Sequence, residues 1–296
     1  MAIFPEPGNR ESRFIPEVWT AGVWTEMRDK LVVGSDLVCN RDYEGEIRDA
    51  GDSVRIPTVT DPSIEDYDPA LGFSGDPQEM TGGKRTFEIE ESKAFRIRVD
   101  DIHKVQSLIG GKYMHEGTSR AGRKLAEASD AYVAAKLVAA ATAEAAKPGR
   151  GNHLIDINLT AAPDVLYGQF VDVKVALDET ETPLDGRYAI ASPALHGRLL
   201  RDERFIDVSK FGSNEPISNG VVGKFLGFYI HLTNALPTDV HLIAGHRIAT
   251  TFADQIVKTE TYRSEKYFAD VVRGLHVYGA KVMRAEHIAV GKVILP

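Results

Sequence analysis

One segment of the sequence has a composition that fits neither a helix nor a strand. Residues 61–83 are rich in proline, glycine and acidic residues, show no periodicity and contain no lysine or arginine. The flanking residues 52–58 and 87–99 alternate like β-strands, with Glu91 and Lys93 interrupting the second apolar face. Loops this long are uncommon in compact domains unless they are functional or disordered. Flanking strands of about seven residues would carry the loop about 25 Å outward, at about 3.3 Å per residue.

A projecting two-stranded hairpin is only marginally stable by itself, so it needs a partner surface. We therefore predict that the loop tip, residues 61–83, contacts a neighbouring copy of the chain. A calcium site is the alternative, but residues 65–68 lack the spacing of an EF-hand loop, which favours a solvated or partner-facing tip. The candidate contact residues are the acidic ones: Asp61, Glu65, Asp66, Asp68, Asp76 and Glu79.

The N-terminal part of the chain combines an extended arm with a short helix. Residues 1–15 are rich in proline, glycine and charge, and apolar residues from Pro16 onward recur at helical spacing until near Gly34. Both tryptophans of the chain, Trp19 and Trp24, lie in this helix. Packing in the core and anchoring on another subunit explain them equally well, so both interpretations stay open.

A long helix is predicted from Lys112 to Ala146, about 50 Å in length. Twelve of its residues are alanine, which gives a high helix propensity. Its apolar arc contains Leu125, Ala128, Tyr132, Val133 and Leu137. We expect Leu137 to face a sheet, and we expect Gly117 and Gly122 to weaken the first half of the helix.

The opposite arc of this helix is basic. Arg120, Arg123 and Lys124 share one side, together with Glu116 and Glu127. One interpretation is a stripe that touches packaged DNA without reading its sequence. The other is a solvated face, which ion pairs within the subunit would favour.

The second half of the chain predicts a mixed α/β region. A helix from Pro163 places Leu166, Phe170, Val173 and Leu177 on one face. A strand follows at residues 188–191, and Ser192 with Pro193 reads as the cap and first residue of a helix through Arg201. Residues 220–232 are sheet-like, and residues 275–282 and 288–295 predict two terminal strands.

Composition restricts the function. The chain has 43 acidic residues against 35 lysines and arginines, a net charge of −8, which argues against tight nucleic-acid binding by the whole chain. It is compatible with lining a container for nucleic acid. No apolar run is long enough to span a membrane. The single cysteine, Cys39, fits a reducing cytoplasm and is interpreted as a small buried hydrophobe.

Catalytic signatures are absent from the sequence. It contains no nucleophile elbow, phosphate-binding loop, zinc-protease motif or dinucleotide-binding motif. Ser192 lacks flanking glycines, so helix capping is favoured over nucleophilic catalysis. His241 and His246 have no carboxylate at ligand spacing, which argues against a metal site. We expect no enzyme activity, no catalytic residue, no metal and no cofactor.

The order of these parts resembles the major capsid proteins of tailed double-stranded-DNA bacteriophages, which have the HK97-type fold. The resemblance covers nearly the whole chain, and its motifs are turn and strand signatures. The stretches that carry it are residues 14–19 (FIPEVW), 40–47 (NRDYEGEI), 51–57 (GDSVRIP), 220–228 (GVVGKFLGF) and 273–281 (RGLHVYGAK).

This resemblance implies an α+β capsid fold. The expected parts are an N-terminal arm and short helix at 1–45, an extended β-hairpin loop at 46–100, a peripheral domain at 101–185 with a spine helix at 111–147, an axial domain at 186–254 and a return to the peripheral domain at 255–296.

The resemblance also implies a role in assembly. Such chains form hexamers and pentamers of an icosahedral shell that encloses double-stranded DNA, and they are located in the virion capsid after assembly in the host cytoplasm. Many carry an N-terminal scaffolding segment that is cleaved on maturation. This sequence has no room for one before its arm, so a separate scaffolding protein and a portal are expected partners, with weak contacts to DNA.

Two other classes of protein remain open. Encapsulins share this type of fold but enclose cargo enzymes, so a cargo-binding groove or DNA in purified particles would distinguish them from a phage shell. An unrecognised hydrolase or metal-dependent enzyme is the less favoured alternative, and turnover that depends on one carboxylate or serine would support it.

Overall fold

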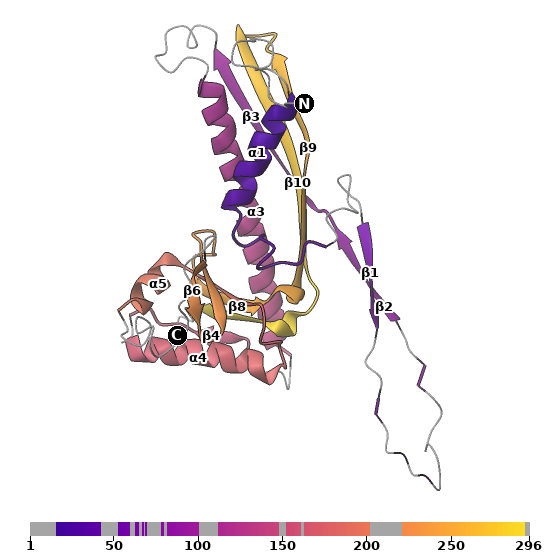
Figure 1. Ribbon diagram of the computed structural model, residues 1–296, viewed down its shortest axis with the longest axis vertical. Helices are drawn as coiled ribbons and strands as arrows, with labels where there is room; N and C mark the ends of the chain where they lie inside the picture. The colour runs from indigo at the N-terminus through magenta and orange to yellow at the C-terminus, as the bar shows by residue number, and fades with distance from the viewer. Residues whose placement is uncertain are drawn as a thin grey trace, which may run out of the picture.

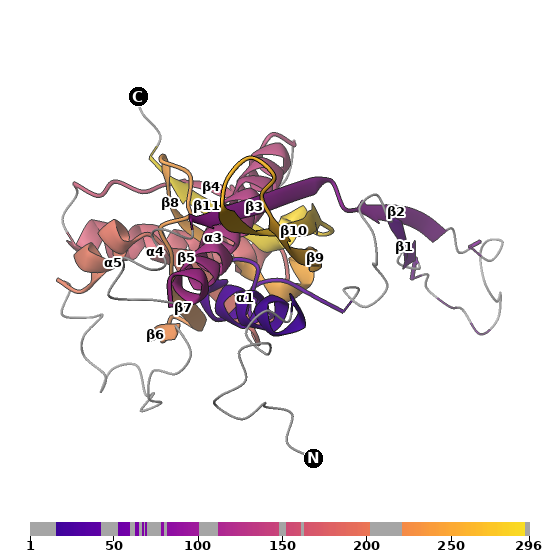
Figure 2. The same ribbon diagram turned by 90° about the horizontal axis from the view of Figure 1, so that it is seen from above.

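A computed structural model gives the arrangement of the chain (Figure 1). It describes residues 16–42, 53–59, 82–100, 112–147, 152–160, 163–201 and 221–293, together with residues 63, 64, 67, 69, 78 and 79. Three parts are visible: a long spine, an α/β region at one end of it and a hairpin that projects sideways (Figures 1 and 2).

The spine is built on one helix, α3 (Lys112–Ala145), which confirms the predicted long helix to within a residue. A three-stranded antiparallel sheet lies along it in the order β3 (Glu91–Asp100), β10 (Ala269–Val282), β9 (Thr250–Arg263). Helix α1 (Pro16–Lys30) packs on α3 and ends four residues before the predicted Gly34. Leu137 is fully buried, and Leu125 and Val133 are buried with it, so the predicted apolar arc is confirmed.

Gly122 has a different role from the one the sequence indicated. A Cβ atom at this position would lie 2.8 Å from the backbone oxygen of Val23 in α1. The glycine therefore permits the close approach of α1 to α3.

The α/β region contains a six-stranded mixed sheet in the order β4-β11-β8-β5-β7-β6. Alternate residues of β5 face opposite ways: Tyr188 and Ile190 join the core around α3, whereas Ala189 and Ala191 join the core beneath α4 and α5. The elements are β4 (Leu154–Asp156), α4 (Pro163–Glu179), β5 (Arg187–Ala191), α5 (Pro193–Leu199), β6 (Val221–Phe225), β7 (Phe228–Leu232), β8 (Val240–His246), the short 3-10 helices η3 (Arg247–Ala249) and η4 (Ala285–His287), and β11 (Ile288–Lys292).

Local sequence signals explain several of these elements. The predicted face of α4 is confirmed, since Leu166, Phe170, Val173 and Leu177 are buried. Ser192 accepts a hydrogen bond from the Leu195 N–H, as predicted for a cap, although α5 ends two residues before the predicted end. β6 and β7 are joined by two residues with positive φ, Leu226 and Gly227, which is typical of a tight hairpin turn.

Two features of the sheets differ from those predicted from the sequence, and the first prediction was wrong. The single strand predicted over residues 87–99 is two strands in different sheets: β2 (Gly82–Glu88) pairs with β1 (Ser53–Val59), and β3 pairs with β10. The interrupted apolar pattern marks the point where the chain passes from one sheet to the other. β8 and β9 were not predicted, because mixed polar and apolar residues weaken their alternation.

Candidate assembly interface

Among the described residues, the hairpin of β1 and β2 contacts the body at its root. Phe87 and Ile89 are buried against Ala253 and Val277 of the spine sheet. The Lys281 ammonium donates a hydrogen bond of 2.7 Å to the backbone oxygen of Thr86. From this root the two strands run away from the spine, and no other described helix or strand lies beside their outer length (Figures 1 and 2).

β10 accommodates the hairpin root closely. A Cβ atom at Gly279 would lie 2.5 Å from the backbone oxygen of Glu88, so only glycine allows this approach. The seven-residue register runs from Ser53 opposite Glu88 to Val59 opposite Gly82. At about 3.3 Å per residue, this ladder extends for roughly 23 Å.

The loop between β1 and β2 is partly described. Glu79 is exposed, and Ser63 donates hydrogen bonds of 2.7 and 2.9 Å from its N–H and hydroxyl to Gln78 Oε1, across the loop. The other predicted contact residues, Asp61, Glu65, Asp66, Asp68 and Asp76, lie outside the described residues. The loop tip as an intersubunit contact therefore stays a prediction.

Two apolar side chains of the loop were missed by sequence reasoning, which attended only to its charge. Ile64 is 97% exposed and Tyr67 is 60% exposed. Large apolar side chains placed among acidic ones on a projection favour contact with another surface over full solvation.

Of the two tryptophans of α1, the structure describes the side chain of Trp24. Trp24 is half-buried, packs against the spine core, and has the Arg28 guanidinium 4.8 Å from its ring centre. The Trp19 side chain lies outside the described residues. Packing against the core therefore accounts for the buried part of the Trp24 side chain. The role of Trp19 and Trp24 as an anchor between subunits stays a prediction.

A buried carboxylate holds the loop that follows α1. Asp130 of α3 is 3% exposed and accepts three hydrogen bonds of 2.9 Å, from the backbone N–H groups of Val32, Val33 and Gly34. Burial raises the pKa of Asp130 to about 6, and the three N–H donors oppose the shift. Asp130 was missed in the sequence because its neighbours along the helix are alanine and serine residues, none of which is a charged partner for its carboxylate.

The same loop is tied to the spine sheet by a second buried group. Arg41 forms an ion pair with Asp254 of β9, and Asp254 accepts a hydrogen bond of 3.2 Å from Nε2 of His276. The backbone N–H of Asn40 donates to Thr250, and that of Phe252 donates to Asn40. These contacts fix the chain on β9 just before it leaves for the hairpin.

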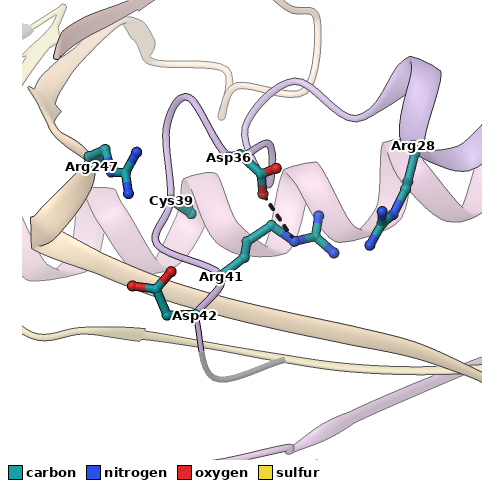
Figure 3. A pocket seen from close by; sticks show the side chains of 6 residues that line it. All are labelled: Arg28, Asp36, Cys39, Arg41, Asp42 and Arg247. Atoms are coloured by element: carbon teal, nitrogen blue, oxygen red, sulfur yellow. Dashed lines mark ion pairs between the residues drawn. The ribbon is translucent and has the colours of Figure 1, made fainter. Parts of the chain in front are cut away.

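A polar pocket of about 360 Å³ lies where this loop crosses the sheet (Figure 3). Arginines from α1, the loop and η3 surround it, and Asp36 pairs with Arg41 at 3.5 Å. Cys39 is fully buried beside it, which confirms its interpretation as a small buried hydrophobe, and burial raises the pKa of its thiol. The lining residues are Arg28, Asp36, Cys39, Arg41, Asp42 and Arg247.

Comparison with known proteins identifies this architecture. A family model described as "Phage capsid protein" matches residues 84–293. The chain belongs to this phage capsid family.

Solved structures agree with the family. The chain is 25% identical to a protein of Mycobacterium phage Che8, with a TM-score of 0.66 and coverage of 86% of this chain and 88% of that one. A capsid protein of Cyanophage P-SCSP1u (17% identity, TM-score 0.65, coverage 83% and 84%) and one from the mature capsid of bacteriophage PhiM1 (16%, 0.62, 82% and 83%) share the fold. A search of curated proteins finds no match.

These findings confirm the central predictions. The fold is the HK97-like capsid fold, and the protein is a structural, non-enzymatic capsid protein that assembles with copies of itself into a shell and is located in the virion. The encapsulin alternative is not favoured, because the matching family is one of phage capsid proteins.

The basic arc of the capsid protein's α3 is exposed and internally paired. Arg120 pairs with Glu116 at 3.1 Å, and Arg123 and Lys124 both pair with Glu127. This is the arrangement that the sequence analysis associated with a solvated face, so that interpretation is favoured and the contact with DNA stays a prediction.

Other residues considered for chemistry have structural roles in the capsid protein. The Ser192 hydroxyl caps α5 and lies 3.2 Å from Nδ1 of His241, while Nδ1 of His246 accepts a hydrogen bond from the Ile248 N–H at the start of η3. Within the described part of the chain, no cluster of three or more His, Cys, Asp or Glu side chains could hold a metal ion. No described helix has the length and apolar character needed to cross a membrane.

Proposed function

We propose that this chain is a major capsid protein whose hexamers and pentamers close an icosahedral shell around double-stranded DNA. The observation that carries the proposal is the match to the phage capsid family over residues 84–293. The projecting hairpin supports it, since its described contacts with the body lie at its root, and a two-stranded ribbon of this kind gains stability by lying on another subunit.

On this proposal, each part of the fold has a role in the assembled shell. The hairpin and its connections, within residues 46–100, act as the extended loop that reaches a neighbour. The spine, within residues 101–185 and 255–296, forms the peripheral domain, and residues 186–254 form the axial domain that meets its counterparts at the centre of each hexamer or pentamer. Trp19 and Trp24 contribute an anchor for the N-terminal arm, residues 1–45.

The partners proposed beyond the chain itself are a separate scaffolding protein, a portal and packaged DNA, which come from the resemblance to tailed-phage capsid proteins. Assembly takes place in the host cytoplasm. Contact with DNA is weak, because the chain carries a net charge of −8 and its exposed α3 arginines are paired.

Electron microscopy of the purified protein tests the proposal. We expect closed particles with five-fold and six-fold clusters of subunits, formed by the chain alone or with a scaffolding protein co-expressed from the same phage. Particles isolated from infected cells should contain nuclease-protected double-stranded DNA. Particles that hold enzymes and no DNA would instead support a cargo compartment, and a chain that stays monomeric under both conditions would contradict the proposal.

A further inference from the structure

Two short helices join the spine sheet to the α/β region. The chain passes from β8 of the six-stranded sheet through η3 to β9 of the spine sheet, and it returns from β10 through η4 to β11. The backbone N–H groups of Met283 and Arg284 donate hydrogen bonds of 2.7 and 3.1 Å to the Ala249 oxygen, so the two crossings are tied to each other. Both lie where the spine sheet ends at the α/β region (Figure 1). A change at these crossings would therefore alter how the spine sheet is set on the α/β region.

A buried histidine stands at each crossing. His246 is the last residue of β8 and is 8% exposed, and His287 is the last residue of η4 and is 7% exposed. Nε2 of His246 lies 2.6 Å from the backbone oxygen of Asp185, and Nδ1 of His287 lies 2.8 Å from the Thr182 hydroxyl oxygen. Both of these partners belong to the turn between α4 and β5, residues 180–186. The two histidines thus connect both crossings to one turn of the α/β region.

A buried arginine holds this turn in place. Arg187 is 2% exposed, and its guanidinium donates hydrogen bonds of 2.9 and 2.5 Å to the backbone oxygens of Pro183 and Thr182. The same guanidinium pairs with Asp178 of α4 at 2.6 Å. The turn is therefore a fixed anchor for both histidines.

The hydrogen bonds of His246 require the neutral imidazole ring. A backbone N–H can only donate, so Nδ1 of His246 is the acceptor in its 3.3 Å hydrogen bond with the Ile248 N–H. A carbonyl oxygen can only accept, so Nε2 carries the single ring proton and donates to Asp185. A second proton, on Nδ1, would place two N–H groups against each other and remove the cap from η3. Protonation of His246 is therefore incompatible with this set of contacts.

The surroundings also disfavour a second proton on either ring. Burial is the largest cause that lowers the pKa of both His246 and His287, and the guanidinium of Arg187 lowers both further. The Asp185 carbonyl, for His246, and the Glu286 carboxylate, for His287, oppose these shifts only in part. Among the described residues, the charged groups on the elements around the pair are Asp178 on α4, Arg187 on β5, Arg247 on η3, Arg284 and Glu286 at η4, and Glu144 with Lys147 at the end of α3.

Acid therefore weakens these crossings. The pKa of His246 in the folded chain is below its ordinary value of 6.5, so the closed junction binds fewer protons than an open one. The junction is at full strength above about pH 6.5, and it weakens as the pH falls from there through the lowered pKa. The direction is opposite to that of Asp130, whose contribution is lost as the pH rises.

We propose that His246 and His287 form a latch between the spine sheet and the α/β region, and that protonation of His246 releases it. With neutral rings, the latch joins both crossings to the turn at residues 180–186. With a protonated ring, η3 loses its cap and the strands bend at η3 and η4, so the angle between the spine sheet and the α/β region changes. The latch is contained in a single subunit and goes beyond the proposed role in a shell, since it does not depend on how the subunits are arranged.

Hydrogen exchange of the full-length chain tests the latch directly. Peptides that cover residues 246–250 and 282–287 are followed by mass spectrometry at about pH 7.5 and about pH 5, with the rates corrected for the chemical effect of pH. We expect protection of both segments to fall several-fold at the lower pH, because the Ile248 N–H loses its acceptor. Peptides around Leu137 in the spine core should keep their protection. Equal protection of the two segments at both pH values would exclude the latch.

Two matched variants assign the effect to one histidine. In His246→Asn, the side-chain amide oxygen takes the place of Nδ1 as acceptor for the Ile248 N–H and does not titrate, so the pH dependence at η3 should disappear. His241→Asn is the control, since His241 is half-buried near the other end of β8 and burial lowers its pKa as well. This control should retain the pH dependence at η3. Retention of the pH dependence in His246→Asn would exclude His246 as the sensor.

A distance measurement distinguishes a latch from a simple helix cap. Spin labels are attached at Lys258→Cys in β9 and Val175→Cys in α4, both exposed, in a chain diluted with unlabelled subunits. Cys39 is fully buried and stays unlabelled. We expect the distribution of distances to be narrow near neutral pH and broader or displaced at about pH 5. Adding His246→Asn should abolish this change.

An unchanged distance would overturn the inference even if exchange at η3 becomes faster in acid, because His246 would then only cap η3. The distance measurement on the chain with native histidines does not depend on the folding of His246→Asn. A failure of that variant to fold therefore leaves the pH dependence of the distance as the deciding result.

Discussion

The spine and the hairpin of this capsid protein are stabilised by different interactions. The spine encloses a continuous core, in which α3 buries Leu137, Val133 and Ala134 against the sheet and α1. The hairpin has a ladder of paired backbone residues, and among its described side chains the buried ones, Phe87 and Ile89, lie at its root. The comparison indicates that the spine is stable within one subunit, whereas on the proposed function the ordered position of the hairpin depends on a neighbouring subunit.

Deletion of residues 64–80 is the strongest test of this difference between the spine and the hairpin. It leaves five residues between Val59 and Gly82, a length that hairpin loops commonly have. We expect a folded subunit whose free energy of unfolding changes by less than about 1 kcal/mol, and we expect that subunit to fail to close shells. Circular dichroism during denaturation and electron microscopy are the two measurements. Normal particles would show that the loop tip is dispensable.

Truncation of Leu137 tests the other half of the comparison. This side chain is fully buried between α3 and the sheet, so Leu137→Ala should lower the free energy of unfolding of the isolated subunit by about 2–5 kcal/mol. Val175→Ala in α4 is the control, since Val175 is 46% exposed and should cost under about 1 kcal/mol. A change of less than half a kcal/mol for Leu137→Ala would show that the buried face of α3 is wrongly assigned.

Asp130 shows how much of the spine depends on a polar group. Asp130→Ala leaves three backbone N–H groups of residues 32–34 without their acceptor and should cost about 3 kcal/mol in urea denaturation. An equal stability of variant and wild type would mean that water replaces the carboxylate.

The pH dependence of stability isolates the charge of Asp130. Its folded-state pKa of about 6 is above the ordinary value of 3.8, so the folded state binds the proton more tightly than the unfolded state. This contribution to stability is fully present below about pH 4 and is lost as the pH rises through about 6. Asp130→Asn should remove this decrease, and identical pH profiles for the two proteins would contradict the assignment.

Substitution of two helical glycines compares a crowded helix surface, at Gly122, with an open one, at Gly168. Gly122→Ala places a methyl group against Val23 of α1 and should destabilise the subunit by about 1–3 kcal/mol. Gly168→Ala in α4 meets nothing within 4 Å and should stabilise it by about 0.5–1 kcal/mol. Thermal melting of both variants should therefore shift in opposite directions; shifts of the same sign would mean that α1 moves to accommodate the added methyl group without cost.

Substitutions in the exposed basic arc of α3 are expected to have the smallest effect on stability and assembly. Replacing Arg120, Arg123 and Lys124 by Gln removes ion pairs worth about 0.3–0.5 kcal/mol each. Shell assembly should be unchanged. Particles filled with DNA should be slightly less stable at low salt if this arc faces the shell interior, and unaltered retention of DNA would support the solvated face.

The parts that the sequence determined are those in which local pattern and final structure agree. The alanine-rich composition and the periodic leucines and valines specify α3, and the Ser192-Pro193 pair specifies the start of α5. The acidic segment, residues 61–83, could be predicted as a loop between two strands because it has no periodicity to place in a core, and the flanking strands β1 and β2 do pair.

Tertiary structure decided the rest, because contacts between distant residues leave no local signal. Asp130 and the loop at 32–34 are nearly one hundred residues apart, and nothing in either segment indicates that they meet. The division of residues 87–99 between two sheets depends on β10 pairing with β3 but not with β2. Likewise, the register of three strands that are far apart in the sequence places Arg273 of β10 between Arg96 of β3 and Glu260 of β9.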